Sequence, residues 1–363
     1  MNRSLLIDVC KLLAAQAIVL HHLSAYGPMR DALHALWPQA IDFFFDHSRL
    51  AVQVFLVMGG FLAAPALHHW QSTQPHPASA LQLVGRRFVR LIPPYAVAVL
   101  LISLLVAVLR PFIAGDWLVD PLGWRSALAH LLTVQGWLGL TSLSVGVWYV
   151  AMDFHLYVLL ALVLAITRRP ALTAVVVWAL VAASVLYFNR QPALDEWPLY
   201  FFGAYGLGVL ASRWPHSRFD RAVFVAAVGT AVLAWWIEPR TRLAVAVVTA
   251  VLLAMLSARR SPGHRLGRWL QSLADASYGT FLTHYGVIVI ASALWAIGSF
   301  HGAAWASVFA VATWAVSVWL GHAFHRRVER PLSAWCGGWL SRFSARMTAR
   351  ATHATRTAPT TRP

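Results

Sequence analysis

The chain has 363 residues, of which 59% are hydrophobic and only 12% are charged. A soluble domain averages about 25% charged residues, so this composition indicates a membrane protein. The formal net charge is +16, but the arginines cluster in short stretches between apolar segments, which points to membrane topology and not to nucleic-acid binding. Cys10 and Cys336 lie at opposite ends of the chain and do not indicate a disulfide framework.

Ten apolar segments approach the roughly 20 residues that a membrane-spanning helix needs. They lie at about 5–25, 49–67, 91–109, 147–166, 171–188, 199–212, 222–237, 243–257, 272–297 and 303–323, and two of them are short. The first contains Lys11, and further spans follow it, which favours a retained helix over a cleaved signal peptide. A weaker segment at 126–140 is expected to be re-entrant or interfacial, because counting it as a span breaks the charge pattern. The predicted fold is an all-α, polytopic integral membrane protein with about ten transmembrane helices.

The distribution of basic residues predicts the orientation. With the N-terminus inside, the cytoplasmic stretches hold most of the 29 basic residues. The outer loops then hold only seven, which are Arg30, Arg49, Arg110, Arg125, Arg190, Arg240 and Arg242. We therefore expect a multi-pass protein of the cell inner membrane with both termini in the cytoplasm. Residues 1–332 form the predicted transmembrane domain, and 333–363 form a basic cytoplasmic tail whose Arg/Thr/Ala-rich composition predicts disorder.

Ionisable residues inside the spans are the candidate functional residues, since a charge at the centre of a spanning helix costs about 2.5–3.5 kcal/mol. The first span has Lys11 and His22, separated by ~16 Å of helical rise and facing within roughly 20° of one another. A cation at the inner end and a base deeper in the bilayer would then line one wall. The alternatives are a lysine that extends to the headgroups and an interfacial histidine.

Three other spans carry polar residues. Arg87 and Arg90 at the inner end of the third are either membrane anchors or ligands for a phosphorylated molecule, because guanidinium groups match phosphate oxygens. Asp153 shares a helix face with Tyr157 and serves either a site or a structural ion pair. His284 falls near mid-bilayer, where an interhelical hydrogen bond is the alternative to a catalytic role.

Six short motifs, in order along the chain, resemble those of the acyltransferase-3 family of integral-membrane O-acyltransferases. The motifs are the Lys11 and His22 pair in the first span, "VFLVMGGFL" at 54–62, "RRFVRLIPPY" with Arg87 and Arg90, "WYVAMDFHLY" with Trp148, Asp153 and Tyr157, "ASYGTFLTHY" with Tyr278 and His284, and "VERP" at 328–331. Two positions depart from the family pattern: Asp153 stands where Glu is usual, and Gly59 where Ser is usual. The chain is similar to the short form of the family, without a fused extracytoplasmic esterase-like domain.

The resemblance implies transfer of an acyl group, commonly acetyl, from cytoplasmic acyl-CoA to a hydroxyl of a cell-surface glycan or lipid-linked sugar. His22 is expected to act as general base, with Asp153 orienting His22 or the acceptor and His284 as a third catalytic residue. The residues expected to bind acyl-CoA are Lys11, Arg87 and Arg90, and the supporting residues are Trp148, Tyr157 and Tyr278.

Apart from acyl-CoA as the donor substrate, the sequence predicts no tightly bound cofactor, no metal and no nucleic-acid partner. Membrane lipid and the acceptor sugar are the other expected partners. The alternative function is a transporter, since intramembrane Asp and His also build proton relays. Against a transporter, the sequence has no inverted repeat and no matched pair of broken helices.

Overall fold

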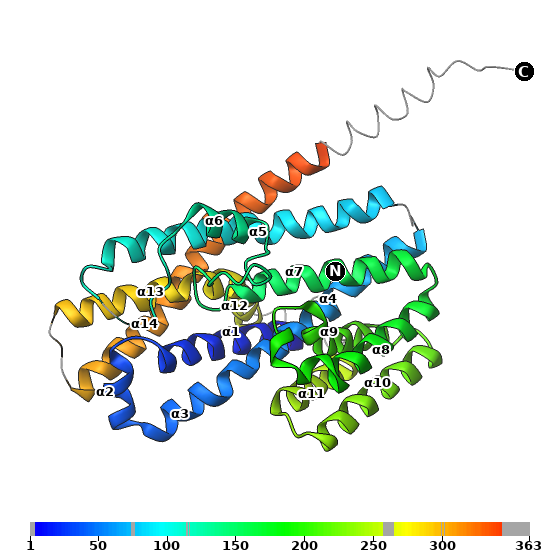
Figure 1. Ribbon diagram of the computed structural model, residues 1–363, viewed down its shortest axis with the longest axis horizontal. Helices are drawn as coiled ribbons and strands as arrows, with labels where there is room; N and C mark the ends of the chain where they lie inside the picture. The colour runs from blue at the N-terminus through cyan, green and yellow to red at the C-terminus, as the bar shows by residue number, and fades with distance from the viewer. Residues whose placement is uncertain are drawn as a thin grey trace, which may run out of the picture.

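The structure is a computed structural model that describes residues 4–73, 77–113, 115, 117–256, 265–298, 300 and 302–342. Most of these residues are helical, and none of them belongs to a β-strand. Many of the long helices run roughly along the longest axis of the molecule (Figure 1).

Each predicted span forms a helix. Eight helical segments are long and apolar enough to cross a membrane. Their main helices are α1 (Leu5–Ala25), α4 (Ala51–Thr73), α5 (Pro77–Leu109), α7 (Trp148–Thr167), α8 (Pro170–Leu186), α10 (Arg218–Ile237), α13 (Ser277–Ile297) and α14 (Ala303–Phe324). The two remaining predicted spans are α9 (Pro198–Arg213) and α11 (Thr241–Leu256), with 16 residues each. The predicted all-α, polytopic fold is therefore confirmed.

Shorter helices connect or flank the spans. α3 (Pro38–His47) passes through the 3₁₀ turn η1 (Ser48–Leu50) into α4, so that residues 38–73 form one nearly continuous helical stretch. The others are α2 (Met29–Leu36), α6 (Trp124–Leu131), η2 (Phe188–Arg190), η3 (Pro192–Leu194), α12 (Arg265–Asp275) and the π-helical turn η4 (His325–Glu329).

The segment predicted to be re-entrant or interfacial, 126–140, contains most of α6 and the turns that follow. α6 has eight residues, too few to cross a bilayer. His130 links α6 to the loop that follows it. Its Nδ1 donates to the carbonyl of Ser126 at 2.7 Å, and its Nε2 accepts a hydrogen bond from the backbone N–H of Leu143 at 3.1 Å. Burial lowers the pKa of His130, which favours the neutral ring that these two bonds require. His130 is therefore a structural residue of this loop.

The predicted span at 272–297 starts too early. α12 ends at Asp275, and Ala276 (φ −79°, ψ −4°) separates it from α13. α12 carries polar and charged residues along "RLGRWLQSLAD", a pattern that suits an interfacial helix better than the hydrocarbon core. Asp275 is therefore at the end of a short flanking helix and not inside a span.

The predicted tail at 333–363 also starts too early, because the helix of α14 continues through η4 to residue 342. The Ser333 hydroxyl donates to the carbonyl of Arg90 at 3.3 Å. Leu340 lies against Gly85, where an added Cβ would be 3.3 Å from the leucine methyl. These contacts hold helical residues 330–342 on α5. Residues 343–363 lie outside the described part of the chain.

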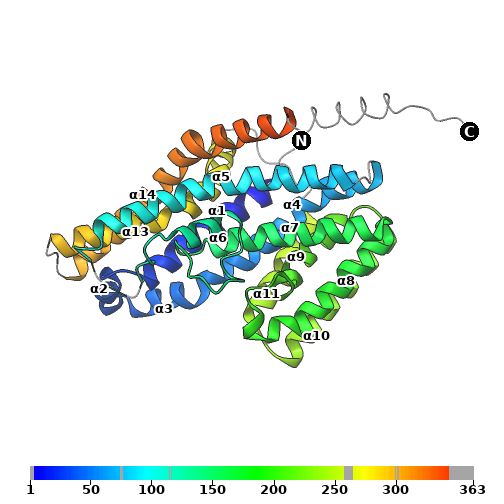
Figure 2. The same ribbon diagram turned by 45° about the horizontal axis from the view of Figure 1, so that its top comes forward.

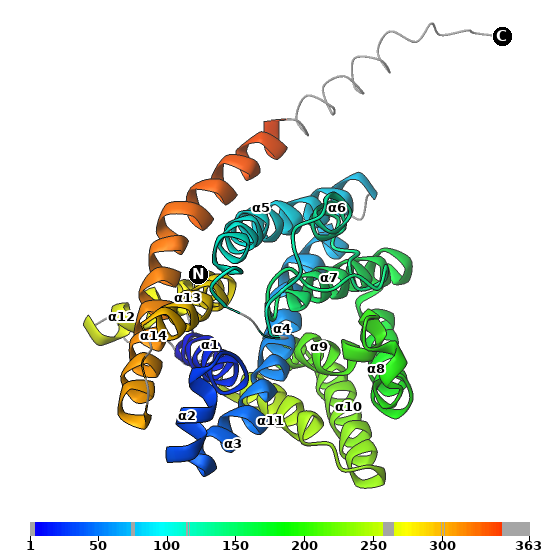
Figure 3. The same cartoon turned by 60° about the vertical axis from the view of Figure 1, so that its left-hand side comes forward.

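The helices form two groups. Figure 3 shows α8, α10 and α11 gathered on one side of α9, with α1, α5, α13 and α14 on the other side of the molecule and α4 between them. Figure 2 shows the same separation from another direction. The first group shares an apolar core with α4 and α7. We call α4 and α7–α11 the packed group, and α1, α5, α13 and α14 the second group.

Close backbone approach joins α4 to α9. A Cβ on Gly60 would lie 2.0 Å from the carbonyl oxygen of Tyr205, and a Cβ on Gly208 would lie 1.9 Å from that of Val57. Only glycine fits at either position without moving the helices apart. Small residues give membrane helices this kind of van der Waals contact, because lipid tails provide no hydrophobic driving force for their association.

One end of the bundle collects the helix termini that carry most of the arginines. The Gln71 amide donates to the carbonyl of Leu164 at 3.0 Å and to the Thr173 hydroxyl at 2.8 Å, which ties the end of α4 to the turn between α7 and α8. Arg213 at the end of α9 forms an ion pair with Asp220 in α10 at 2.6 Å. We call this the basic end.

Candidate functional site

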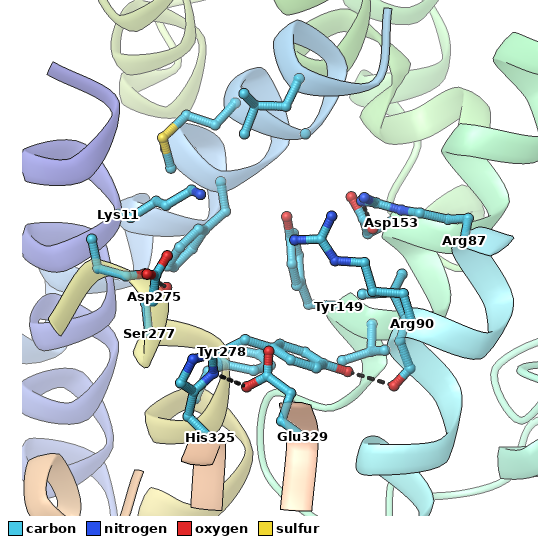
Figure 4. Close-up of a pocket in the computed structure, with 18 residues that line it drawn as sticks. Lys11, Arg87, Arg90, Tyr149, Asp153, Asp275, Ser277, Tyr278, His325 and Glu329 are labelled. Atoms are coloured by element: carbon cyan, nitrogen blue, oxygen red, sulfur yellow. Dashed lines mark hydrogen bonds and ion pairs between the residues drawn. The ribbon is translucent and has the colours of Figure 1, made fainter. Parts of the chain in front are cut away.

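A cavity of ≈220 Å³ lies between the two groups of helices, nearer the basic end. Its lining comes from α1, α4, α5, α7, α12, α13 and η4 (Figure 4). We call it the central cavity. Helices from distant parts of the sequence pack around this cavity and bring their side chains together.

Charged side chains line the walls of the central cavity. Lys11 of α1 extends into it from one wall, and Arg87 and Asp153 face it from the opposite wall (Figure 4). The guanidinium of Arg90 projects into the space between them (Figure 4). The carboxylates of Asp275 and Glu329 also line the cavity, so a negatively charged ligand that enters from the basic end would meet Lys11 and Arg90 beside these acidic groups.

Arg87 and Asp153 form an ion pair between α5 and α7. The Arg87 guanidinium also lies over the ring of Tyr157, 5.4 Å from the ring centroid. The charge of Arg87 is thus balanced by protein groups, as expected for a charge removed from water. Gly59 faces this pair, since a Cβ on Gly59 would lie 2.9 Å from Oδ1 of Asp153. A serine at position 59 would have to displace the Asp153 carboxylate.

The lower wall of the central cavity in Figure 4 is polar and well bonded. The Tyr278 hydroxyl donates to the carbonyl of Leu91 at 2.9 Å, which joins α13 to α5. His325 and Glu329, one turn apart on η4, are linked through Nδ1 and Oε2 at 2.9 Å. The π-helical turn places both side chains on the cavity. Turns of this kind occur often at functional sites.

Beyond the central cavity, α1 and α13 bring two buried histidines together. Nδ1 of His22 lies 2.7 Å from Nε2 of His284, and the two rings stack with centroids 4.9 Å apart. We call them the histidine pair. Nδ1 of His284 faces the carbonyl oxygens of Phe281 at 2.8 Å and Thr280 at 3.2 Å. Carbonyl oxygens only accept, so this nitrogen carries the proton of His284.

That assignment determines the tautomer of His22. A neutral His284 with its proton on Nδ1 has a lone pair on Nε2 and accepts there. Nδ1 of His22 must then donate to it, which leaves the lone pair of a neutral His22 on Nε2. The arrangement can orient a histidine whose second nitrogen is able to take a proton.

Three aromatic rings lie at the boundary between the central cavity and the histidine pair. Phe55, Tyr149 and Phe281 all line the cavity, with ring centroids 5.8–6.4 Å apart. The Phe281 ring centroid is also 6.2 Å from that of His284. We call the three rings the aromatic layer. Phe281 therefore contacts both the cavity and the histidine pair.

The residues expected from the sequence separate into two levels. Lys11, Arg87, Arg90, Asp153 and Tyr278 line the central cavity. His22 and His284 form the deeper level. The Asp153 carboxylate pairs with Arg87, and the hydrogen-bond partner of His22 is His284, so the structure shows no contact through which Asp153 would orient His22; the other expected role, orienting the acceptor, stays a prediction.

The two other supporting residues lie outside the central cavity. Trp148 packs on Phe201, with ring centroids 5.4 Å apart, on the side of α7 that faces the packed group. Tyr157 contacts the site only through its ring beneath Arg87.

Sequence reasoning missed several residues of the site. Tyr149 and Phe281 are aromatic residues in aromatic-rich spans, where composition gives no signal for a site. His325 lies in a stretch that reads as an arginine-rich helix end, "HRRVERP", and Glu329 belongs there to the "VERP" motif, which gives it no role in the site. Their spacing of four residues is the available signal, because it places an imidazole and a carboxylate on one helix face.

A comparison with protein-family models matches residues 5–322 to the acyltransferase domain of the acyltransferase-3 family. Searches of curated proteins and of solved structures found no match. The matched region covers the helices that carry the central cavity and the histidine pair, and it ends before η4. With its membrane-spanning helices and this match, the chain belongs to the acyltransferase-3 family and is a multi-pass membrane acyltransferase.

Proposed function

We propose that the protein transfers an acyl group, commonly acetyl, from cytoplasmic acyl-CoA to a hydroxyl of a cell-surface glycan or lipid-linked sugar. The observation that carries this proposal is a cavity at the basic end, into which Lys11 and Arg90 extend, with a histidine pair deeper along the same α1–α13 interface. The donor carries phosphates, and the reaction needs a base, so the two levels match its two requirements.

The donor side of the proposal depends on Lys11 and Arg90. Both side chains extend into the central cavity, which the anionic donor would approach from the basic end. Arg87 has a different role from Arg90 in this account, since its ion pair with Asp153 already balances its charge. We assign Arg87 and Asp153 to the cavity wall, where they fix α5 against α7.

The chemical step depends on His22. Its Nε2 takes the proton of the acceptor hydroxyl while the hydroxyl oxygen bonds to the thioester carbonyl carbon. The carbon–sulfur bond then breaks, and the leaving CoA thiolate receives the proton. His284 acts as a positioning residue, because its Nε2 accepts a hydrogen bond from the Nδ1–H of His22. It would stabilise the imidazolium that forms when His22 is protonated.

The aromatic layer has a place in this reaction. The thioester must reach His22 past Phe55, Tyr149 and Phe281, and their rings surround the path with apolar surface. A site that excludes water limits hydrolysis of the thioester.

The proposed orientation puts the basic end in the cytoplasm and the chain in the inner membrane. Reporter fusions after Ala25, Arg169 and Gly298 should then report outside, inside and outside. A cytoplasmic signal after Gly298 would invert the site and contradict donor binding from the cytoplasm.

The function is tested with purified protein in lipid nanodiscs, isotopically labelled acetyl-CoA and a glycan–lipid extract of the envelope from a strain that lacks the gene. We expect free CoA and label in the acceptor fraction to appear in equal amounts. Mass spectrometry of the deletion strain beside its parent should show the loss of one acyl unit from the natural acceptor. A transporter would move a solute along a gradient without consuming acetyl-CoA, and that result would overturn the proposal.

A further inference from the structure

A second cavity of ≈390 Å³ opens beside the central cavity at the basic end. It lies between the first half of α5 and the helical residues that follow η4. The two cavities share the lining residues Arg90, His325 and Glu329, so they are adjacent parts of one path.

The second cavity is cationic. Arg86, Arg90 and Arg330 line it, and all three side chains are exposed. The acidic residue in its lining is Glu329, which is hydrogen-bonded to His325. Ser333 adds a hydroxyl. Forked guanidinium donors on both walls suit a ligand with phosphate oxygens.

Six of the nine residues that line this cavity lie outside the family match. Residues 5–322 match the acyltransferase domain, whereas Arg330 and Ser333 belong to the helical extension. The extension is fixed to α5 by the bond from Ser333 to the carbonyl of Arg90 and by the contact of Leu340 with Gly85. The helical extension therefore forms one wall of the cavity and is held in place against α5.

The volumes of the two cavities also indicate that a large ligand would need both of them. Ligand sites for small molecules commonly enclose about 300–1,000 Å³. The central cavity, at ≈220 Å³, is too small for a whole CoA molecule, which consists of a 3′-phosphorylated ADP joined to a pantetheine arm. The second cavity supplies the missing volume next to it.

We propose that the 3′-phospho-ADP part of acyl-CoA binds in the second cavity against Arg86 and Arg330, while the pantetheine arm passes Arg90 into the central cavity. This inference rests on the proposed function and adds to it a donor subsite built partly by the helical extension. Charge-assisted bonds to phosphate hold the nucleotide there, and they take no part in the chemical step.

The test compares two donors in nanodiscs: acetyl-CoA and acetyl-pantetheine, which lacks the nucleotide. The variant carries Arg86→Gln and Arg330→Gln. We expect the KM for acetyl-CoA to rise by about tenfold or more with kcat unchanged, since the lost contacts serve binding alone. The KM for acetyl-pantetheine should stay the same. Free 3′-phospho-ADP should compete with acetyl-CoA in the wild type and compete at least tenfold more weakly in the variant.

The matched control carries Arg326→Gln and Arg327→Gln, which remove the same charge from exposed residues of η4 that do not line either cavity. It should leave both KM values unchanged. An unchanged KM for acetyl-CoA in the Arg86/Arg330 variant, or an equal rise in the control, would overturn the subsite.

The phosphate of a lipid headgroup is the other ligand that the arginines of the second cavity could bind. A rise in KM that is equal for both donors and appears only in nanodiscs with anionic lipid would assign the second cavity to lipid headgroups and overturn the proposal. Wild-type protein that transfers acetyl from neither donor would overturn the proposed function itself, whereas turnover without the expected difference in KM would overturn only the subsite.

Discussion

The packed group and the second group of helices differ in what they bury. In the packed group, α4 and α9 meet through Gly60 and Gly208, and the shared core is apolar. In the second group, α1, α5 and α13 direct Lys11, Arg90 and the histidine pair toward the interface between the groups. The difference indicates that one group is a close-packed support and that the other supplies most of the reactive side chains.

The largest expected effect comes from the histidine pair. His22→Ala should lower acyl transfer by about 10²–10⁴-fold, because it removes the general base. His284→Ala should lower it less, since the base remains but loses its partner. Transfer is measured in membranes with protein amounts matched by immunoblot.

His21→Ala is the control for this experiment. His21 lies next to His22 but packs against Phe45, with ring centroids 5.8 Å apart. We expect nearly normal transfer. Equal losses from His21→Ala and His22→Ala would contradict the assignment of the base.

The Arg87–Asp153 pair joins the two groups, and breaking it should affect stability first. Asp153→Ala leaves the Arg87 charge buried without its partner, which costs about 3–5 kcal/mol. The double variant Arg87→Met with Asp153→Leu should recover most of the thermal stability in detergent. It should still bind acetyl-CoA more weakly than the wild type, because apolar side chains replace two polar groups in the wall of the cavity. No recovery in the double variant would mean that the pair does more than balance charge.

The packed group should be sensitive at its glycine contacts. Gly208→Ala places a methyl against the Val57 carbonyl and should cost ~1–3 kcal/mol, the usual range for overpacking. Gly229→Ala on α10 is the matched control, because no atom lies within 4 Å of the added Cβ. It should be neutral or slightly stabilising. Fluorescence-detected size-exclusion chromatography after heating compares the two, and equal melting would contradict the close α4–α9 contact.

The smallest effect is expected at Tyr278. Tyr278→Phe removes the hydrogen bond to the Leu91 carbonyl and should cost about 0.5–1.5 kcal/mol of stability. The acetyl-CoA KM should change little, since the hydroxyl is already bonded within the protein. A loss of kcat with unchanged stability would show that Tyr278 takes part in the reaction.

Hydropathy and loop charge predicted the helices well, because a bilayer requires long apolar segments whatever their partners are. The errors came at the edges. α12 interrupts the predicted span at 272–297, and the helix after η4 extends past residue 332. Both boundaries fall in stretches that mix polar and apolar residues, where hydropathy does not define the end of a helix.

The candidate site was predictable in many of its charged residues and histidines but not in their pairing, nor in the aromatic residues Tyr149 and Phe281. The spacing of Lys11 and His22 placed them on one helix face; in the structure Lys11 extends into the central cavity and His22 bonds to His284 of α13. Nothing local in the sequence indicates that Asp153 pairs with Arg87, or that His284 is the partner of His22. Those pairs form between residues that are 66 and 262 positions apart, and helix packing alone decides them.

The central claim is that donor binding and proton transfer occur at separate levels of one site. The most direct measurement determines donor affinity and the single-turnover rate of transfer in the same nanodisc samples of Arg90→Ala and His22→Ala. The account predicts a crossover: Arg90→Ala binds acetyl-CoA at least tenfold more weakly and transfers at a near-normal rate once saturated, whereas His22→Ala binds normally and transfers about 10²–10⁴-fold more slowly. If both variants lose the same quantity, either affinity or rate, the two-level account is wrong.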